Sequence, residues 1–141
     1  MTYPYNDEQM IFRDGMYYLT EKALNFMGID IRARLSESNA VSPEYTINMI
    51  LETVSNAIYG YIHEFNNDNN AQDRMIATVP SLRRIIKLAL EQQAYYLLSL
   101  GDQAMTLDDD KIKHMVSPHA KQTLNRTIPE LGVPITYIGG I

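Results

Sequence analysis

Cysteine and tryptophan are both absent from this 141-residue sequence, and the lack of cysteine excludes several kinds of chemistry. A chain without thiols has no disulfide framework, no cysteine nucleophile and no sulfur ligand for a metal ion. Small secreted domains usually depend on such groups. The composition therefore favours a protein that works in a reducing interior.

Long apolar runs and basic side chains are also scarce. No stretch of 18 apolar residues occurs, and the opening MTYPYNDEQM has neither a basic start nor an apolar segment, so we expect no export signal and no membrane span. The 12 Lys and Arg residues are outnumbered by 17 Asp and Glu residues, which gives a net charge of −5. This balance argues against a protein whose main task is to bind phosphates.

Length and apolar periodicity predict a single helical domain. A chain of 141 residues fits one core, because single domains usually span on the order of 100 to 200 residues. After the Ser42-Pro43 start, apolar residues from Tyr45 to Phe65 recur at three- and four-residue steps, which predicts a helix of about 22 residues that buries these side chains on one face. The same pattern covers 81–100, after a bend expected around Thr78 and Val79 because Pro80 cannot sit in a helix interior without breaking or kinking it. With the polar turn 66–70, these helices predict an all-α fold: a small helical bundle built on a long antiparallel helix hairpin, with an extended C-terminal arm.

Shorter signals divide the rest of the chain. Thr20 is a suitable N-cap for a short helix that stops at Gly28. Ser117 and Pro118 repeat the cap-then-proline start for a helix to about Leu124. The expected organisation is a flexible N-terminal segment 1–18, a helical domain 19–124 and an extended C-terminal docking tail 125–141.

The histidines and the run Asp108–Asp110 are the candidates for catalysis or metal binding. His114 and His119 are five residues apart with Ser-Pro between them, whereas four-residue spacing would place two ligands on one helix face. His63 is expected on the flank of the long helix. Three consecutive aspartates point in different directions in any regular structure, which favours a solvated loop. We expect no enzymatic activity, no metal site and no cofactor.

The densest basic cluster consists of Arg83, Arg84 and Lys87 in the second long helix. No compact three-helix unit with a short glycine turn precedes it, which argues against a DNA-reading helix. A solvated or subunit-contacting face is the favoured interpretation. Tyr95 joins that face, because the neighbouring Tyr96 lies about 100° away around the helix and takes the buried position.

The tail ends in GVPITYIGGI, which has no charged side chain. Burial of its apolar side chains would contribute about 8 to 15 kcal/mol, while ordering ten residues of backbone costs roughly 10 to 20 kcal/mol. Docking by one tail alone is therefore marginal, unless its backbone joins a sheet edge or many copies dock in one assembly. Its roughly 17 extended residues could reach about 55 Å, far enough for another subunit. The predicted docking positions are Val133, Ile135, Tyr137, Ile138, Gly139 and Ile141, with Tyr137 as the main anchor.

Two stretches are similar to a known family. LEQQAYYLLSLGD, residues 90–102, ends a long helix, and VSPHAKQTL, residues 116–124, leads to a tail with PITYIGG. These stretches resemble the head-tail connector (adaptor) proteins of tailed bacteriophages, especially phages of Gram-positive hosts. In that family a similar helix closes on a Gln, an aromatic residue and a Gly-Asp pair, and a Ser-Pro-x-Ala helix leads to a C-terminal Tyr-x-Gly segment. The short and long helices from about Leu19 also occur in the same order.

The resemblance implies a structural virion protein, made in the host cytoplasm and located in the neck between capsid and tail. Such proteins form a homo-oligomeric ring, usually of twelve copies, below the portal protein, and extend the DNA channel toward the tail. It implies that Ser117 and Pro118 start the tail-launching helix, and that Ile135, Tyr137 and Gly139 dock on the portal or on other neck and tail-completion proteins. DNA would pass through without sequence-specific binding. The alternative, suggested by Arg83, Arg84 and Lys87, is a DNA-associated helical regulator or packaging factor.

Overall fold

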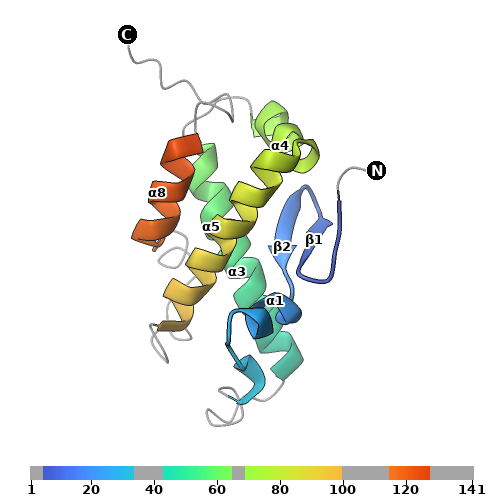
Figure 1. The fold of residues 1–141 in the computed structure, drawn as a ribbon, viewed down its shortest axis with the longest axis vertical. Helices are drawn as coiled ribbons and strands as arrows, with labels where there is room; N and C mark the ends of the chain where they lie inside the picture. The colour runs from blue at the N-terminus through green and yellow to red at the C-terminus, as the bar shows by residue number, and fades with distance from the viewer. Residues whose placement is uncertain (1–4, 34–42, 65–68, 100–114, 128–141) are drawn as a thin grey trace.

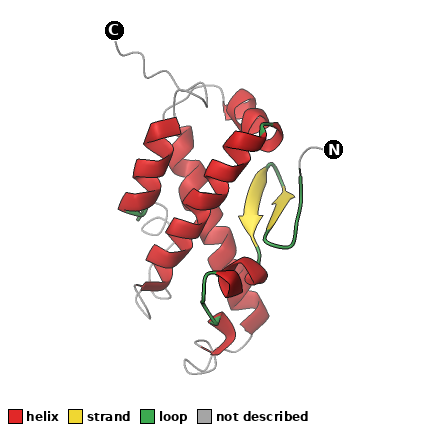
Figure 2. Cartoon of the chain, in the orientation of Figure 1, coloured by secondary structure: helices red, strands yellow, loops and turns green. Residues whose placement is uncertain are grey.

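The computed structural model describes residues 5–33, 43–64, 69–99 and 115–127. Most of these residues are helical, which confirms the expected helical class (Figure 1). Figure 2 shows that a small two-stranded sheet accompanies the helices. The elements, in chain order, are β1 (Met10–Arg13), β2 (Met16–Leu19), α1 (Glu21–Phe26), α3 (Pro43–His63), α4 (Asn69–Thr78), α5 (Pro80–Ser99) and α8 (Pro118–Thr127).

The sheet is an antiparallel hairpin near the N-terminus, so the all-α prediction is wrong in this respect. Met10 pairs with Leu19 and Arg13 with Met16. The connecting residues Asp14 and Gly15 have φ values of 53° and 83°, the left-handed conformations that a tight two-residue hairpin turn requires. Residues 1–18 are therefore not simply the flexible extension expected, because part of this segment is built into the fold.

Helix α3 fastens the hairpin to the helical body through backbone groups of β2. The backbone N–H of Tyr17 donates to the Tyr59 hydroxyl at 3.0 Å, and the Tyr17 carbonyl accepts from the Ser55 hydroxyl at 2.9 Å. On the other strand, Asn6 and Asp7 accept hydrogen bonds from backbone N–H groups of β1. These hydrogen bonds satisfy backbone groups on the two outer edges of the hairpin, which pairing between β1 and β2 leaves without a partner.

Tyr17 is the central contact between the hairpin and the helices. Its side chain is fully buried, and its hydroxyl donates to the carbonyl of Ala77, near the end of α4, at 2.9 Å. Carbonyls in the last turn of a helix have no partner within the helix, so Tyr17 satisfies one of them. The ring also lies edge-on to Phe12, with centroids 5.0 Å apart.

The start signals of the helices agree with the sequence. Thr20 caps α1 by accepting a hydrogen bond from the Ala23 N–H, and α3 begins at Pro43 as predicted. Proline has no N–H to lose at the first helical position. Within α3, Ile47, Ile50, Leu51, Val54, Ile58 and Ile62 form the predicted buried face. Tyr45, expected on that face, is instead 70% exposed.

Two helices meet just before Pro80, at the place where the sequence predicts a bend. Helix α4 ends at Thr78 and α5 begins at Pro80, because proline cannot sit in a helix interior. The two long helices α3 and α5 are thus separated along the chain by α4 as well as by a polar segment. Helix α8 runs to Thr127 rather than to Leu124, so residues 125–127, assigned above to the tail, are helical.

Helix α5 is the element around which the others pack. It contacts α3, α8, α4, α1 and β2, with α8 on one side and the hairpin on the other (Figure 1). Its buried side chains include Leu82, Ile86, Leu90, Gln93 and Leu97. The apolar ones belong to a single core that also includes Tyr17, Leu24 and Leu124. No helix in the described part of the chain has the length and apolarity that a membrane crossing needs.

Candidate functional site

The predicted tail-launching residues meet the second half of α5 at a buried junction. The amide of Gln93, which is fully buried, donates from Nε2 to the Met115 carbonyl at 2.9 Å and accepts at Oε1 from the Ser117 N–H at 2.7 Å. The Ser117 hydroxyl accepts from the N–H groups of His119 and Ala120 at 3.2 and 3.3 Å. Ser117 is thus the N-cap of α8, with its own N–H held by Gln93. Pro118 is the first residue of α8 and is exposed.

The far end of α8 is fixed to the last turns of α3. The Tyr61 hydroxyl donates to Asn125 Oδ1 at 2.7 Å, and the Lys121 ammonium lies 5.9 Å from the Tyr61 ring centroid. Partial burial raises the pKa of Tyr61. Thr123 also donates to Gln92 of α5 at 2.7 Å. The helix that precedes the tail is therefore held at both ends.

The basic cluster does not form one continuous face. The Arg83 guanidinium lies over the Tyr5 ring at 4.5 Å, and Lys87 Nζ donates to Gln9 Oε1 at 2.7 Å. Both side chains hold the N-terminal segment against α5. Arg84 and Tyr95 are exposed, and Tyr95 has 61% of its surface accessible. Of the four residues of the predicted subunit-contact face, Arg84 and Tyr95 are the exposed ones, and their contact with another subunit stays a prediction.

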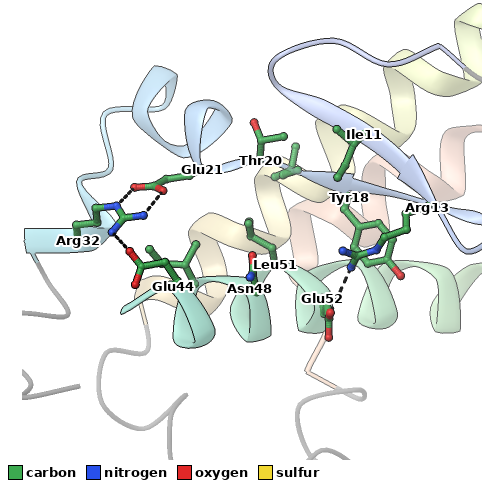
Figure 3. Close-up of a pocket in the computed structure, with 12 residues that line it drawn as sticks. Ile11, Arg13, Tyr18, Thr20, Glu21, Arg32, Glu44, Asn48, Leu51 and Glu52 are labelled. Atoms are coloured by element: carbon green, nitrogen blue, oxygen red, sulfur yellow. Dashed lines mark hydrogen bonds and ion pairs between the residues drawn. The ribbon is translucent and has the colours of Figure 1, made fainter. Parts of the chain in front are cut away.

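A groove that the sequence did not predict lies between the hairpin, α1 and the first half of α3. It encloses about 210 Å³, and the buried side chains of Tyr18, Ile47 and Leu51 line it. Ile11 of β1 also lines it and is 37% exposed. Figure 3 shows this apolar part between two charged ends. The shape suits an apolar side chain that enters from outside.

An ion-paired arginine lies at each end of the groove. At one end Arg32 donates to Glu21 at 2.6 and 3.0 Å and to Glu44 at 2.8 Å. The hydrogen bonds that Arg32 donates to Glu21 and to Glu44 raise the pKa of Arg32, and the hydrogen bond from Arg32 lowers the pKa of Glu44. At the other end Arg13 donates to Glu52 at 3.2 Å and lies over the Tyr18 ring (Figure 3). The groove is thus apolar inside and polar at its rim.

The histidines show no arrangement for metal binding in the described ranges. His63, at the end of α3, pairs with Asp73 of α4 at 2.8 Å, and His119 is exposed on α8. No group of three or more His, Cys, Asp or Glu residues that could hold a metal ion occurs in these ranges. His114 and Asp108–Asp110 lie outside the described residues.

The predicted tail-docking positions also lie outside the described residues. They are Val133, Ile135, Tyr137, Ile138, Gly139 and Ile141. Comparison with protein-family models, with curated proteins and with solved structures finds no match.

Two structural features were not predicted from the sequence, the hydrogen bonds of Gln93 and the groove. The first is the role of Gln93, which the apolar periodicity places on the buried face without indicating a partner. The second is the groove, which depends on the hairpin. The dipeptide Asp14-Gly15, between the apolar runs MIF and MYYL, is a strong hairpin signal that could have revealed it.

Proposed function

We propose that this chain is a structural virion protein of the head-tail connector (adaptor) type. In this proposal, copies form a ring below the capsid portal and extend the DNA channel toward the tail. Its fold is a small helical bundle built on α3 and α5, with a C-terminal docking arm that starts after α8. Its partners are the portal protein and other neck or tail-completion proteins.

The observation that carries the proposal is the junction between Gln93 and Ser117. The two stretches that resemble the connector family, residues 90–102 and 116–124, are separate in the sequence. Their described parts are joined by a buried amide that bonds to backbone on both sides of Val116. This contact supports reading the two stretches as one structural unit instead of two chance matches.

The attachment of α8 supports the docking arm. Helix α8 is bound to α5 at its start through Gln93 and to α3 near its end through Asn125. An arm that leaves a fixed helix end loses less orientational freedom on docking than one that leaves a mobile end. Docking by a single tail is near energetic balance. The smaller loss of orientational entropy and the simultaneous docking of many tails in one ring therefore both favour assembly.

The alternative function, a DNA-associated regulator or packaging factor, has weaker support. Of the three basic residues that suggest it, Arg83 and Lys87 contact Tyr5 and Gln9 of the same chain. The net charge of −5 also opposes duplex binding. A salt titration of binding to duplex DNA separates the two, since a genuine DNA binder loses affinity steeply as salt rises.

The test of the proposed function uses a truncation that removes no described residue. Full-length protein and a variant lacking residues 129–141 are each mixed with purified portal rings from the same phage. We expect the full chain to add a ring of density below the portal in electron microscopy, and the truncated chain to stay unbound with unchanged helical circular dichroism. Portal binding by neither chain, or equally by both, would contradict the proposal.

A further inference from the structure

Helix α5 carries one line of exposed side chains that no part of the described chain covers. Arg84, Leu88 and Tyr95 follow one another at steps of four and seven residues, which places them on one side of a helix. Leu88 is 46% exposed and Tyr95 is 61% exposed. The buried residues of α5, such as Ile86 and Gln93, lie on the other side. We refer to Arg84, Leu88 and Tyr95 as the α5 stripe.

The groove between the hairpin and α3 has a volume suited to one large side chain. Its volume of about 210 Å³ is below the roughly 300 to 1,000 Å³ of typical small-molecule pockets. It is closer to the space that a large side chain occupies at a protein interface. Ile11, Tyr18 and Leu51 give it an apolar interior, and buried Tyr anchors seated in such pockets dominate many interfaces.

Charge also favours contact between the two surfaces. Three carboxylates (Glu21, Glu44 and Glu52) and two guanidinium groups (Arg13 and Arg32) line the groove, so its net charge is −1. The exposed Arg84 has no ion-pair partner in the described ranges. Glu91 lies on the same side of α5, between Leu88 and Tyr95, and is partly buried. The exposed charge at the start of the stripe is that of Arg84, and this end is attracted to a groove with an excess of carboxylate.

The stripe and the groove are separate parts of the same chain, because no residue that lines the groove belongs to α5. A contact between them in two copies is heterologous: each copy offers its stripe to one neighbour and its groove to another. Such head-to-tail contacts close into a ring when the rotation between copies permits. An isologous dimer, by contrast, would bury the same patch twice.

We propose that the groove of one copy receives the α5 stripe of a second copy, with Tyr95 in the apolar interior and Arg84 near the carboxylates of the rim. This inference rests on the proposed function, since it identifies the two faces through which neighbouring subunits of the ring meet. It assigns the interface to the described helical body. The C-terminal tail remains available for a different partner.

Site-directed cross-linking tests the pairing of the two faces, because the natural chain has no cysteine to interfere. One cysteine replaces Asn48 at the groove (Asn48→Cys) and another replaces Ser99 beside the stripe (Ser99→Cys); both positions are exposed. A short bis-maleimide is added to each single variant, to their mixture and to the double variant, with and without portal rings. The matched control combines Asn48→Cys with Gln122→Cys on the exposed face of α8.

We expect the mixture to give a cross-linked dimer, the double variant to give a ladder of higher species, and each single variant to give neither. Addition of Tyr95→Ala should reduce the product at least about fivefold, as expected for an interface anchor. The inference is overturned if the Gln122 control cross-links equally well, if one single variant forms dimers as readily as the mixture, or if no pair-specific product forms with or without portal rings. Portal-bound rings that lack this product leave the proposed function intact. Cross-linked ladders from a chain that does not bind portal rings would support this subunit interface and contradict the proposed function.

Discussion

The side-chain oxygen of Gln93 accepts a hydrogen bond from the backbone N–H of Ser117 at 2.7 Å, across 24 residues of sequence. The same amide donates to the Met115 carbonyl. The Gln93 side chain therefore pairs with the backbone on both sides of Val116 much as a neighbouring strand would, and it fixes the position at which α8 starts. The direction of α8, and of any chain that follows it, depends on this buried contact.

Replacement of Gln93 by methionine should destabilise the protein by about 2 to 4 kcal/mol, because a partly buried carbonyl and a buried N–H both lose their partner. Methionine has a similar length and helix propensity, so packing and helix formation change little. Urea denaturation measures the difference. Gln122→Met on the exposed face of α8 is the control and should stay within about 0.5 kcal/mol of the parent protein. Equal effects at both positions would contradict the assigned role.

Ser117→Ala should lower the free energy of unfolding by about 1 kcal/mol, through loss of the N-cap of α8. The hydroxyl now accepts from the N–H groups of His119 and Ala120, which alanine would leave without that partner. Amide hydrogen exchange should accelerate first in the opening turn of α8. Ser81→Ala, at an exposed position of α5, should show no comparable change. Retained protection at His119 and Ala120 in the Ser117 variant would exclude the cap.

Tyr59→Phe should cost about 1 to 3 kcal/mol, because the buried N–H of Tyr17 loses its acceptor. The loss should also loosen the hairpin, since this N–H forms one of the bonds from β2 to α3. Hydrogen exchange at Tyr17 reports on it directly. Tyr95→Phe removes the same atom from an exposed ring and should leave stability unchanged. A Tyr59 variant as stable as the Tyr95 variant would show that the hairpin does not depend on this bond.

The ion pair between Arg32 and Glu44 predicts a small loss of stability in acid. The hydrogen bond from Arg32 holds the pKa of Glu44 below its ordinary value of 4.5. As pH falls, Glu44 is therefore protonated at a higher pH in the unfolded chain than in the folded protein. The contribution is complete above pH 4.5 and is lost as pH falls through the lowered pKa. Relative to Glu44→Gln, the natural protein should melt about 1 to 3 °C higher at pH 7, with a difference that shrinks in acid and in high salt. Glu64→Gln, at an exposed position outside the groove, is the matched control for the loss of one surface carboxylate, and an equal loss of stability at pH 7 in this variant would contradict the assigned role of the ion pair.

The helices were predictable because their signals are local. Pro43, Pro80 and Pro118 each mark the first residue of a helix, and the apolar spacing identifies most of the buried face of α3. The apolar spacing wrongly placed Tyr45 in the buried face of α3. Apolar periodicity predicts which side of a helix is buried, but it does not predict which turns of that side are covered by a neighbouring element. In the structure the first turn of α3 carries Tyr45 out into solvent.

The candidate sites were less predictable, since they depend on contacts between distant segments. Arg83 contacts Tyr5 and Lys87 contacts Gln9, 78 residues away in both cases. No local pattern in α5 indicates that the N-terminal segment covers these cations. The groove has the same origin, because it exists only where the hairpin meets α3.

Gln72 and Gln93 are both fully buried, but only Gln93 has hydrogen-bond partners in the described part of the chain. A buried amide without partners costs about 1 to 3 kcal/mol relative to an apolar group of similar shape. Gln72→Met should therefore stabilise the protein by about 1 to 2 kcal/mol, whereas Gln93→Met destabilises it. Measured side by side in urea, the two substitutions should shift the midpoint in opposite directions. A loss of stability in both would mean that the Gln72 amide is hydrogen-bonded in solution, and crystallography of the parent protein would then identify the group that it binds.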